Sequence, residues 1–358
     1  MKLSEALLQI NRRTGIFRSN WVCKGADPEV FVIKDGNPIS SGVFIKKQPF
    51  TAYSGMVIRD GFQLELNPYP SPCRETLILE LARILRDLYA TCKQDSFALS
   101  RESTVLLDRK TLASLDKESK RFGCAPDFNA YTGKENSVTI DGETWPERYA
   151  GGHMHAGPPD YYDSVNNQTV DVWHKNAEDI VKVMDAVIGN FCVLLDRKGG
   201  IRAKYYGQAG AFRRQPHGLE YRVPSNFWLM HPGLTHIIFG LLDFSFFIWE
   251  YKLKDALFTL VKEEDVATAI NDFDFKLARE NYTKIEPIFD ACGGRGIDEF
   301  YSTSGISPNT IDLFNFLVEK GIDKFVSDDI FKNWGIADNK QTPMGIRFFR
   351  DINMEMKE

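Results

Sequence analysis

The chain has 358 residues and a formal net charge of −5, and its length predicts about two domains. Apolar residues make up 43% of it and charged residues 26%, which is typical of a globular protein and excludes a disordered or collagen-like chain. The acidic balance disfavours a dedicated nucleic-acid binder and a protein held on an anionic membrane, so we expect neither kind of partner.

Six cysteines are spread along the chain, and none has the C-x-x-C spacing of a redox or metal motif. In a chain of this length we expect them to be reduced and structural, which predicts a cytoplasmic protein. Residues 1–14 are expected to form a short amphipathic helix. Glu5 lies inside what would be the apolar core of a secretory signal, so this segment is not predicted to be one.

Strands and turns are predicted between residues 20 and 70. The segment KGADPEVFVI runs into the turn sequence DGNP at 35–38, which is typical of a hairpin, and DGFQLELNPYPSP forms a later strand that its prolines end. Apolar residues then recur at helical spacing over 73–96, which predicts a helix. Loops and short elements are expected over 100–150.

The second half of the chain is predicted to be mainly helical. A strand at 151–158 (GGHMHAGP) is followed by a long helix over 166–194 and by the strand LEYRVPS, and from residue 226 onward the pattern is helical. Breaks are expected near Gly293-Gly294 and Ser307-Pro308. Because strands and helices are mixed without regular β-α-β alternation, we predict an α+β fold with an antiparallel-rich sheet.

One apolar run, at 234–251, is nearly long enough to cross a bilayer. Asp243 lies at its middle, where a carboxylate in lipid costs about 2.5–3.5 kcal/mol. We therefore expect a buried core helix that begins after Pro232-Gly233.

Four of the predicted strands each present an unusual set of polar side chains on one face, because residues i and i+2 of a strand point the same way. In chain order these side chains are Asp27 and Glu29, Glu65, His153 and His155, and Glu220 and Arg222. Clustered carboxylates repel one another, so a divalent cation would stabilise such a face. Oxygen-rich ligands with one or two imidazoles favour Mg²⁺ or Mn²⁺ over zinc.

The segment before the last strand is basic. It holds Arg202, Lys204, Arg213 and Arg214 between glycines, and arginine is suited to two-pronged phosphate contacts. Cations held by carboxylates opposite arginines can neutralise the β- and γ-phosphates of a nucleotide. The chain has neither a P-loop motif nor a G-x-G-x-x-G motif after a strand, so ATP would bind through cations and arginines.

Four motifs follow one another as G-x-D-x-E, L-E-x-N-P, G-G-H-x-H and L-E-x-R-x-P-S, and GCAPDFNAY stands at 123–131. In this order they resemble the phage-type carboxylate–amine ligases (amidoligases) of the glutamine synthetase / glutamate–cysteine ligase superfold. The resemblance covers roughly residues 22–230. It implies a curved, antiparallel-rich sheet of glutamine-synthetase-like type with helices packed on one face. This catalytic domain, at 21–250, would follow an N-terminal helix at 1–20 and precede a mainly helical region at 251–358.

The resemblance also implies roles for individual residues. Those implied as metal ligands are Asp27, Glu29, Glu65, His153 and Glu220. Those implied in nucleotide binding or catalysis are His155, Arg222, Arg213 or Arg214 as a second phosphate contact, Lys204 in the same basic segment, and Asp127 for positioning substrate or metal. One position departs from the family pattern, since Asp27 stands where relatives carry Glu and Pro28 follows it.

The activity implied is the ATP-dependent joining of a carboxylate to an amine. The carboxylate would attack the γ-phosphate of ATP to give an acyl phosphate, and the amine would then expel phosphate, with Mg²⁺ or Mn²⁺ as the metal. The substrates are left open between a small molecule, a peptide and a protein side chain, as is the oligomeric state. A phage-infected or bacterial cytosol is the implied setting.

Two other interpretations remain. A zinc-dependent hydrolase would use the H-x-H pair with the acids. However, the chain lacks the repeated strand–helix units of barrel hydrolases, and it has Ala156 and Gly157 where a double-stranded β-helix metal site needs a Glu. A non-enzymatic phage structural or interaction protein would retain the fold alone. Retention of every acid, both histidines and Arg222 favours an enzyme.

Overall fold

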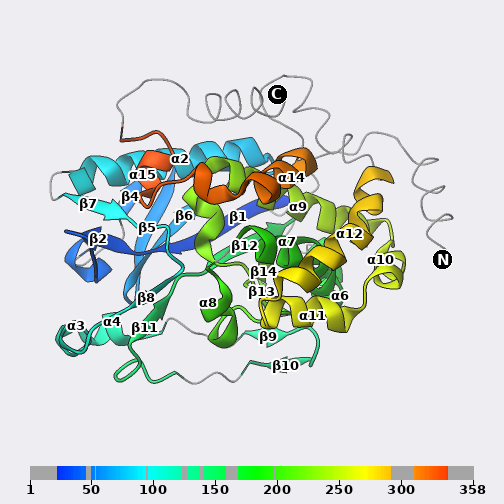
Figure 1. Ribbon diagram of the computed structural model, residues 1–358, viewed down its shortest axis with the longest axis horizontal. Helices are drawn as coiled ribbons and strands as arrows, with labels where there is room; N and C mark the ends of the chain where they lie inside the picture. The colour runs from blue at the N-terminus through cyan, green and yellow to red at the C-terminus, as the bar shows by residue number, and fades with distance from the viewer. Residues whose placement is uncertain are drawn as a thin grey trace.

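A computed structural model describes residues 22–45, 50–52, 54–93, 96–122, 127–136, 140–158, 168–196, 198–291 and 310–337. The fold is α+β, as predicted, and is built on a nine-stranded sheet in which every pair of neighbouring strands is antiparallel. Helices cover this sheet and extend to one side of it (Figure 1). The predicted helix at 1–14 and the breaks near Gly293 and Ser307 lie outside the described residues.

The large sheet has the strand order β10-β9-β13-β14-β12-β1-β6-β5-β4. Its strands are β1 (Cys23–Val30), β4 (Phe50–Ala52), β5 (Gly55–Asp60), β6 (Gln63–Pro68), β9 (Phe128–Asn129), β10 (Lys134–Glu135), β12 (Gly152–Gly157), β13 (Ala211–Gln215) and β14 (Gly218–Tyr221). Two smaller sheets join β2 (Val32–Lys34) with β3 (Asn37–Ile39) and β7 (Phe97–Leu99), and β8 (Thr104–Leu106) with β11 (Glu147–Tyr149). The four predicted polar strands thus all belong to one sheet, where they lie side by side in the order β14-β12-β1-β6.

The predicted hairpin at 35–38 is confirmed. Strands β2 and β3 pair with Lys34 opposite Asn37, and the two loop residues, Asp35 and Gly36, have φ angles of 50° and 79°. This left-handed backbone suits Asp-Gly, and it matches the twist of a two-residue turn to that of the strands.

The helices are α2 (Arg74–Cys92), α3 (Arg109–Ser114), α4 (Lys117–Lys120), α5 (Gln168–Lys175), α6 (Ala177–Met184), α7 (Asn190–Leu195), α8 (Gly200–Tyr205), α9 (Pro232–Glu250), α10 (Lys254–Leu260), α11 (Glu263–Asn271), α12 (Phe275–Ala291), α14 (Thr310–Lys320) and α15 (Ile330–Asn333). The predicted helix over 73–96 is α2, and the described part of the chain beyond residue 226 is helical as expected. The apolar face of the large sheet packs against α2, α5 and α6, and Leu64, Met154 and Leu219 on that face are buried.

The helix predicted over 166–194 is interrupted. Its described residues form α5, α6, one π-helical stretch (Asp185–Gly189) and α7. The break before α6 falls at Asn176, whose side-chain amide donates to the carbonyl of Val172. At the π stretch, Asp185 turns its carboxylate to the sheet, where it accepts from the amide of Gly210 and the hydroxyl of Tyr221 at 2.6 Å each. Each break thus falls at a polar side chain with its own hydrogen bonds: Asn176 binds a backbone carbonyl of its own segment, and Asp185 binds residues of the sheet.

Helix α9 is the apolar run that the sequence singles out. Within the described part of the chain it is the one helix long and apolar enough to span a membrane, and 94% of its apolar window is buried inside the protein. Its mid-helix carboxylate, Asp243, forms an ion pair with Lys24 of β1 at 2.7 Å, and both side chains are almost fully buried. The expected core helix is therefore present, and its charge is neutralised from the sheet.

Asp243→Ala is expected to lower the free energy of unfolding by about 3–5 kcal/mol, because it leaves the buried Lys24 ammonium without its counter-charge. Urea unfolding measures the loss. Arg83→Ala is the matched control, since Arg83 pairs with Glu80 at 2.8 Å but is half exposed, and its removal should change the same free energy by no more than about 0.5 kcal/mol. Equal losses in the two variants would contradict a role for Lys24–Asp243 in the core.

The described cysteines agree with a reduced chain. Cys23, Cys73, Cys92 and Cys192 are free thiols, and the last two are buried.

Candidate active site

The polar side chains predicted to share a sheet face lie together. Strand register places Glu29 opposite Glu65, Asp27 opposite His153, and His155 opposite Glu220. Residues paired across antiparallel strands project on the same side of the sheet. The register therefore brings the acids of β1, β6 and β14 and the imidazoles of β12 onto one face.

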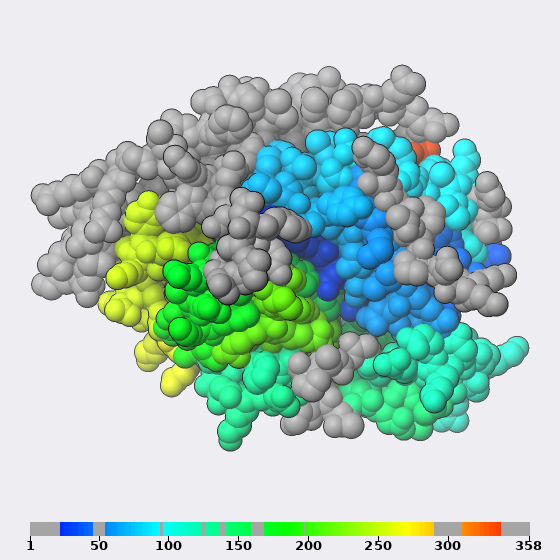
Figure 2. Space-filling view, turned by 180° about the vertical axis from the view of Figure 1, so that it is seen from behind, coloured from blue at the N-terminus to red at the C-terminus, as the bar shows by residue number. Residues whose placement is uncertain are grey.

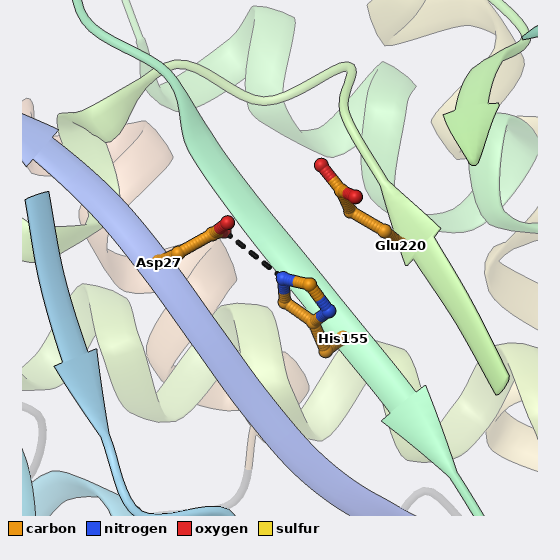
Figure 3. A group of neighbouring side chains, drawn as sticks. All are labelled: Asp27, His155 and Glu220. Atoms are coloured by element: carbon orange, nitrogen blue, oxygen red, sulfur yellow. Dashed lines mark ion pairs between the residues drawn. The ribbon is translucent and has the colours of Figure 1, made fainter. Parts of the chain in front are cut away.

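Asp27, His155 and Glu220 form the first ligand group, and each comes from a different neighbouring strand (Figure 3). One ligand atom from each lies within 4.8 Å of the others, and His155 Nε2 is 3.1 Å from Asp27 Oδ1. Among the described residues, buried Asp27 Oδ1 has no hydrogen bond of good geometry. A buried carboxylate oxygen whose near neighbours are imidazoles, next to a second acid, fits a bound cation.

The second ligand group consists of Glu29, Asp60 and Glu65, whose carboxylate oxygens also lie within 4.8 Å of one another. The backbone amide of Gly151 donates to Glu29 Oε2 at 2.7 Å, and the side-chain amide of Asn67 donates to Glu65 Oε1 at 2.9 Å. Asp60 was not predicted as a site residue. It ends β5 opposite Gln63 of β6, so the Asp-Gly turn in DGFQLELNP was the signal that could have placed it on the polar face.

The electrostatics of the second group favour a cation as well. Burial, together with Asp60, raises the pKa of Glu29 to about 8. Burial, together with Asp27, raises the pKa of Glu65 to about 9. Three closely spaced carboxylates, one buried and two partly buried, cannot all ionise at neutral pH without positive charge, and a divalent cation would supply it.

In the first ligand group the two histidines lower the pKa of Asp27. Burial alone would raise the pKa of this carboxyl, but His155 and His153 hold it well below its usual range. Burial opposes protonation of His155, yet Asp27 raises the pKa of that imidazole. His155 Nδ1 also lies 3.0 Å from Nε2 of His217 in the β13–β14 turn. The imidazole is thus fixed on both sides.

His153 and Arg222 form the floor between the groups. His153 Nδ1 is 3.5 Å from Asp27 Oδ1 and 3.4 Å from Arg222 Nη1. Burial and the Arg222 charge lower the pKa of His153 to about 3, so its ring is neutral. Arg222, itself buried, donates to Glu220 and to the Tyr206 hydroxyl. The sequence assigned metal binding to His153 and nucleotide contact to His155, whereas the geometry brings His155 into the ligand group.

Of the remaining predicted residues, two border the site and two lie away from it. Arg213 Nη1 lies 3.5 Å from Glu220 Oε1, and Asp127 Oδ2 lies 3.4 Å from Arg222 Nε, so both border the site. Arg214, the next residue along β13, points to the other face, where it pairs with Glu178 of α6 at 2.5 Å. Lys204 is exposed on α8. The structure therefore brings neither Arg214 nor Lys204 to the group, and of the two arginines left open it is Arg213 that faces it.

A cleft with a volume of about 450 Å³ borders the second ligand group. Glu29, Asp60 and Tyr206 line its inner end, and the segment around α4 lines its outer end. In the space-filling view from behind, residues of this middle part of the chain, in teal, run along the lower edge of the molecule, below the blue strands and green helices (Figure 2). No pattern in the sequence indicated this cleft.

Residues 172–261 match the family model described as phage phiEco32-like COOH.NH2 ligase-type 2. The match supports the phage-type carboxylate–amine ligase family. It agrees with the resemblance of the motifs, and a ligase family supports an enzyme that forms carbon–nitrogen bonds. No curated protein matches the chain.

The segment matched to this ligase family runs from within α5 to the end of α10. It contains Glu220, Arg222 and Arg213, whereas Asp27, Glu29 and the other ligand residues precede it. The family match and the carboxylates on β1, β5 and β6 are therefore largely independent observations. Glu220 of β14 belongs both to the matched segment and to the first ligand group.

Proposed function

We propose that the protein is an ATP-dependent carboxylate–amine ligase that forms an amide bond through an acyl phosphate, on a sheet of glutamine-synthetase-like type. The observation that carries the proposal is the pair of ligand groups on one sheet face, with Arg213 and Arg222 beside one of them. A structural metal ion would need only one of these ligand groups, whereas phosphoryl transfer uses cations and arginines together. The cytoplasm, where ATP is available, is the setting we propose.

Mg²⁺ or Mn²⁺ fits both ligand groups, because their donors are mainly carboxylate oxygens. We propose that Asp27, His155 and Glu220 hold one cation, with His153 adjacent, and that Glu29, Asp60 and Glu65 hold the other. When bound, the cations neutralise the charge of the triphosphate and of the substrate carboxylate.

The chain's own residues would align the reactants. Arg222 and Arg213 would contact the γ-phosphate on the side of Glu220. A carboxylate oxygen of the substrate then forms a bond to the γ-phosphorus, the bond to the bridging oxygen breaks, and ADP leaves. The amine nitrogen next bonds to the acyl carbon, inorganic phosphate leaves, and the ammonium proton passes to a base. Such positioning supplies most of the catalysis in phosphoryl transfer.

A crystal soaked with a non-hydrolysable ATP analogue and Mn²⁺ tests the proposal directly. We expect anomalous density for manganese at both ligand groups and the triphosphate beside Arg222. Zinc in the protein as purified, with hydrolytic activity that needs no ATP, would contradict it in favour of a metal-dependent hydrolase.

The pH dependence of stability gives an independent test of cation binding. In EDTA, Glu29 and Glu65 are protonated in the folded state up to about pH 8 and 9, whereas in the unfolded chain they ionise near pH 4. Their raised pKa values therefore stabilise the fold at low pH, and this stabilisation is lost as the pH rises towards 9. We expect the free energy of unfolding to fall by several kcal/mol between pH 5 and pH 9.

Saturating Mg²⁺ should remove most of this fall, because a bound cation stabilises the ionised carboxylates. Urea unfolding at five pH values, with EDTA or with Mg²⁺, measures both curves. The variant Glu29→Gln/Glu65→Gln should show a flatter EDTA curve and a smaller response to Mg²⁺. Parallel curves in EDTA and Mg²⁺ would contradict a cation at the second ligand group.

A further inference from the structure

The cleft of about 450 Å³ has a size suited to a small ligand. Its inner end, at Glu29 and Asp60, belongs to the second ligand group. Neither Asp27, His155 nor Glu220 lines it. Tyr206, whose hydroxyl accepts from Arg222, also lines the cleft, so a molecule there would reach the second ligand group beside Tyr206.

One wall of the cleft is aromatic and rigid. The rings of Tyr149 and Tyr205 stack with centroids 5.9 Å apart, and Trp145 packs edge-on against Tyr205 at 5.1 Å. Behind this wall Arg148 is almost fully buried, donates to the carbonyls of Trp145 and Glu147, and lies with its guanidinium 4.8 Å from the Phe122 ring. Such a preorganised wall can contact the uncharged middle of a ligand without being reordered.

The outer end of the cleft carries a cluster of basic side chains. Lys117, Lys120 and Arg121 line it from α4 and the residue that follows, and the acidic Asp141 and Glu143 line the same cleft. This segment is attached to the sheet, because Arg59 of β5 pairs with Asp116 and donates to Ser119 Oγ at 2.7 Å. The basic side chains therefore project from a fixed support.

The three basic side chains differ in whether an acidic side chain already pairs with them. Lys120 pairs with Glu143 at 2.8 Å and Arg121 with Glu118 at 3.3 Å. Lys117 lines the cleft without an ion pair to any other residue that the structure describes. It can therefore bind an incoming anion without first losing a partner.

We propose that this cleft binds the acid substrate and selects one that carries two acidic groups. One carboxylate would lie beside Glu29 and Asp60, where it is activated, and the second would contact Lys117 and Arg121, with the linking atoms along the Tyr149–Tyr205 wall. This inference rests on the proposed function for the site at its inner end. It names Lys117, Arg121 and the tyrosine wall as determinants of substrate specificity.

The test compares diacids with monoacids of the same length. Binding of adipate and suberate is measured by isothermal titration calorimetry in Mg²⁺, and hexanoate and octanoate serve as their monoacid counterparts. We expect at least one diacid to bind at least tenfold more tightly than its counterpart. Lys117→Met and Arg121→Met, both at exposed positions, should remove most of that preference, whereas Lys110→Met on α3 should leave it unchanged.

A non-hydrolysable ATP analogue is titrated separately into the same proteins. If it fails to bind the wild type, the proposed function fails, while a diacid preference that depends on Lys117 would still identify the ligand class of the cleft. If it binds and no diacid is preferred, the inference about the cleft is wrong and the proposed function stands. A loss of affinity for the analogue in Lys117→Met, with diacid binding unchanged, would also overturn the inference, since the cleft would then hold the nucleotide.

Discussion

Each of the substitutions Glu29→Ala, Glu65→Ala and Glu220→Ala should lower ligase activity by about 10²–10³-fold or more, because each removes a proposed cation ligand. The measurement is hydroxamate formation from ATP, Mg²⁺, hydroxylamine and a panel of carboxylic acids. Hydroxylamine traps the acyl phosphate, so the assay does not require the natural amine. Full activity in any two of the three variants would count decisively against the assignment.

Glu178→Ala is the matched control for these variants. Glu178 also pairs with an arginine of β13, but on the helix-covered face of the sheet, and its loss should leave hydroxamate formation unchanged. Because Glu220 neutralises the buried Arg222, its removal also affects stability. Glu220→Gln keeps the shape of the side chain, and its thermal melting separates lost catalysis from lost folding.

Arg222→Lys should lower kcat/KM for ATP by about 10–100-fold, because a lysine ammonium cannot reproduce a two-pronged phosphate contact. The measurement is steady-state release of ADP at varied ATP. Arg214→Lys provides the comparison, since this arginine faces away from the site and contacts Glu178. Unchanged ATP kinetics in Arg222→Lys, or an equal loss in both variants, would contradict the phosphate-binding role.

The polar sheet face could be predicted because strand alternation is a local property. Once β1, β6, β12 and β14 are strands of one sheet, i and i+2 residues must share a face, and the structure places Asp27, Glu65 and His155 accordingly. The same rule separates Arg213 from Arg214, but only after the register of β13 is known. The α+β class followed from the absence of regular β-α-β alternation, and the core position of α9 followed from the carboxylate of Asp243 within its apolar run.

Other features depend on contacts between distant parts of the chain and could not be predicted. Asp60 joins the second ligand group because β5 pairs with β6; its Asp-Gly turn marks the end of a strand, but only that pairing brings its carboxylate to Glu29 and Glu65. The cleft requires α4 to be attached through Arg59 to a strand far from it in sequence. The break at Asp185 depends on the hydroxyl of Tyr221, which belongs to β14. These are tertiary effects, and a local pattern does not contain them.

The position of β14 in the sheet has a consequence for biosynthesis. Glu220 reaches Asp27 only because β14 docks beside β12, which in turn lies beside β1. A nascent chain that has not yet emerged from the ribosome beyond β14 therefore lacks one acid of the first ligand group. Under the proposed function, the first ligand group is complete only once translation has passed Tyr221, and a truncated product ending before β14 is expected to lack ligase activity.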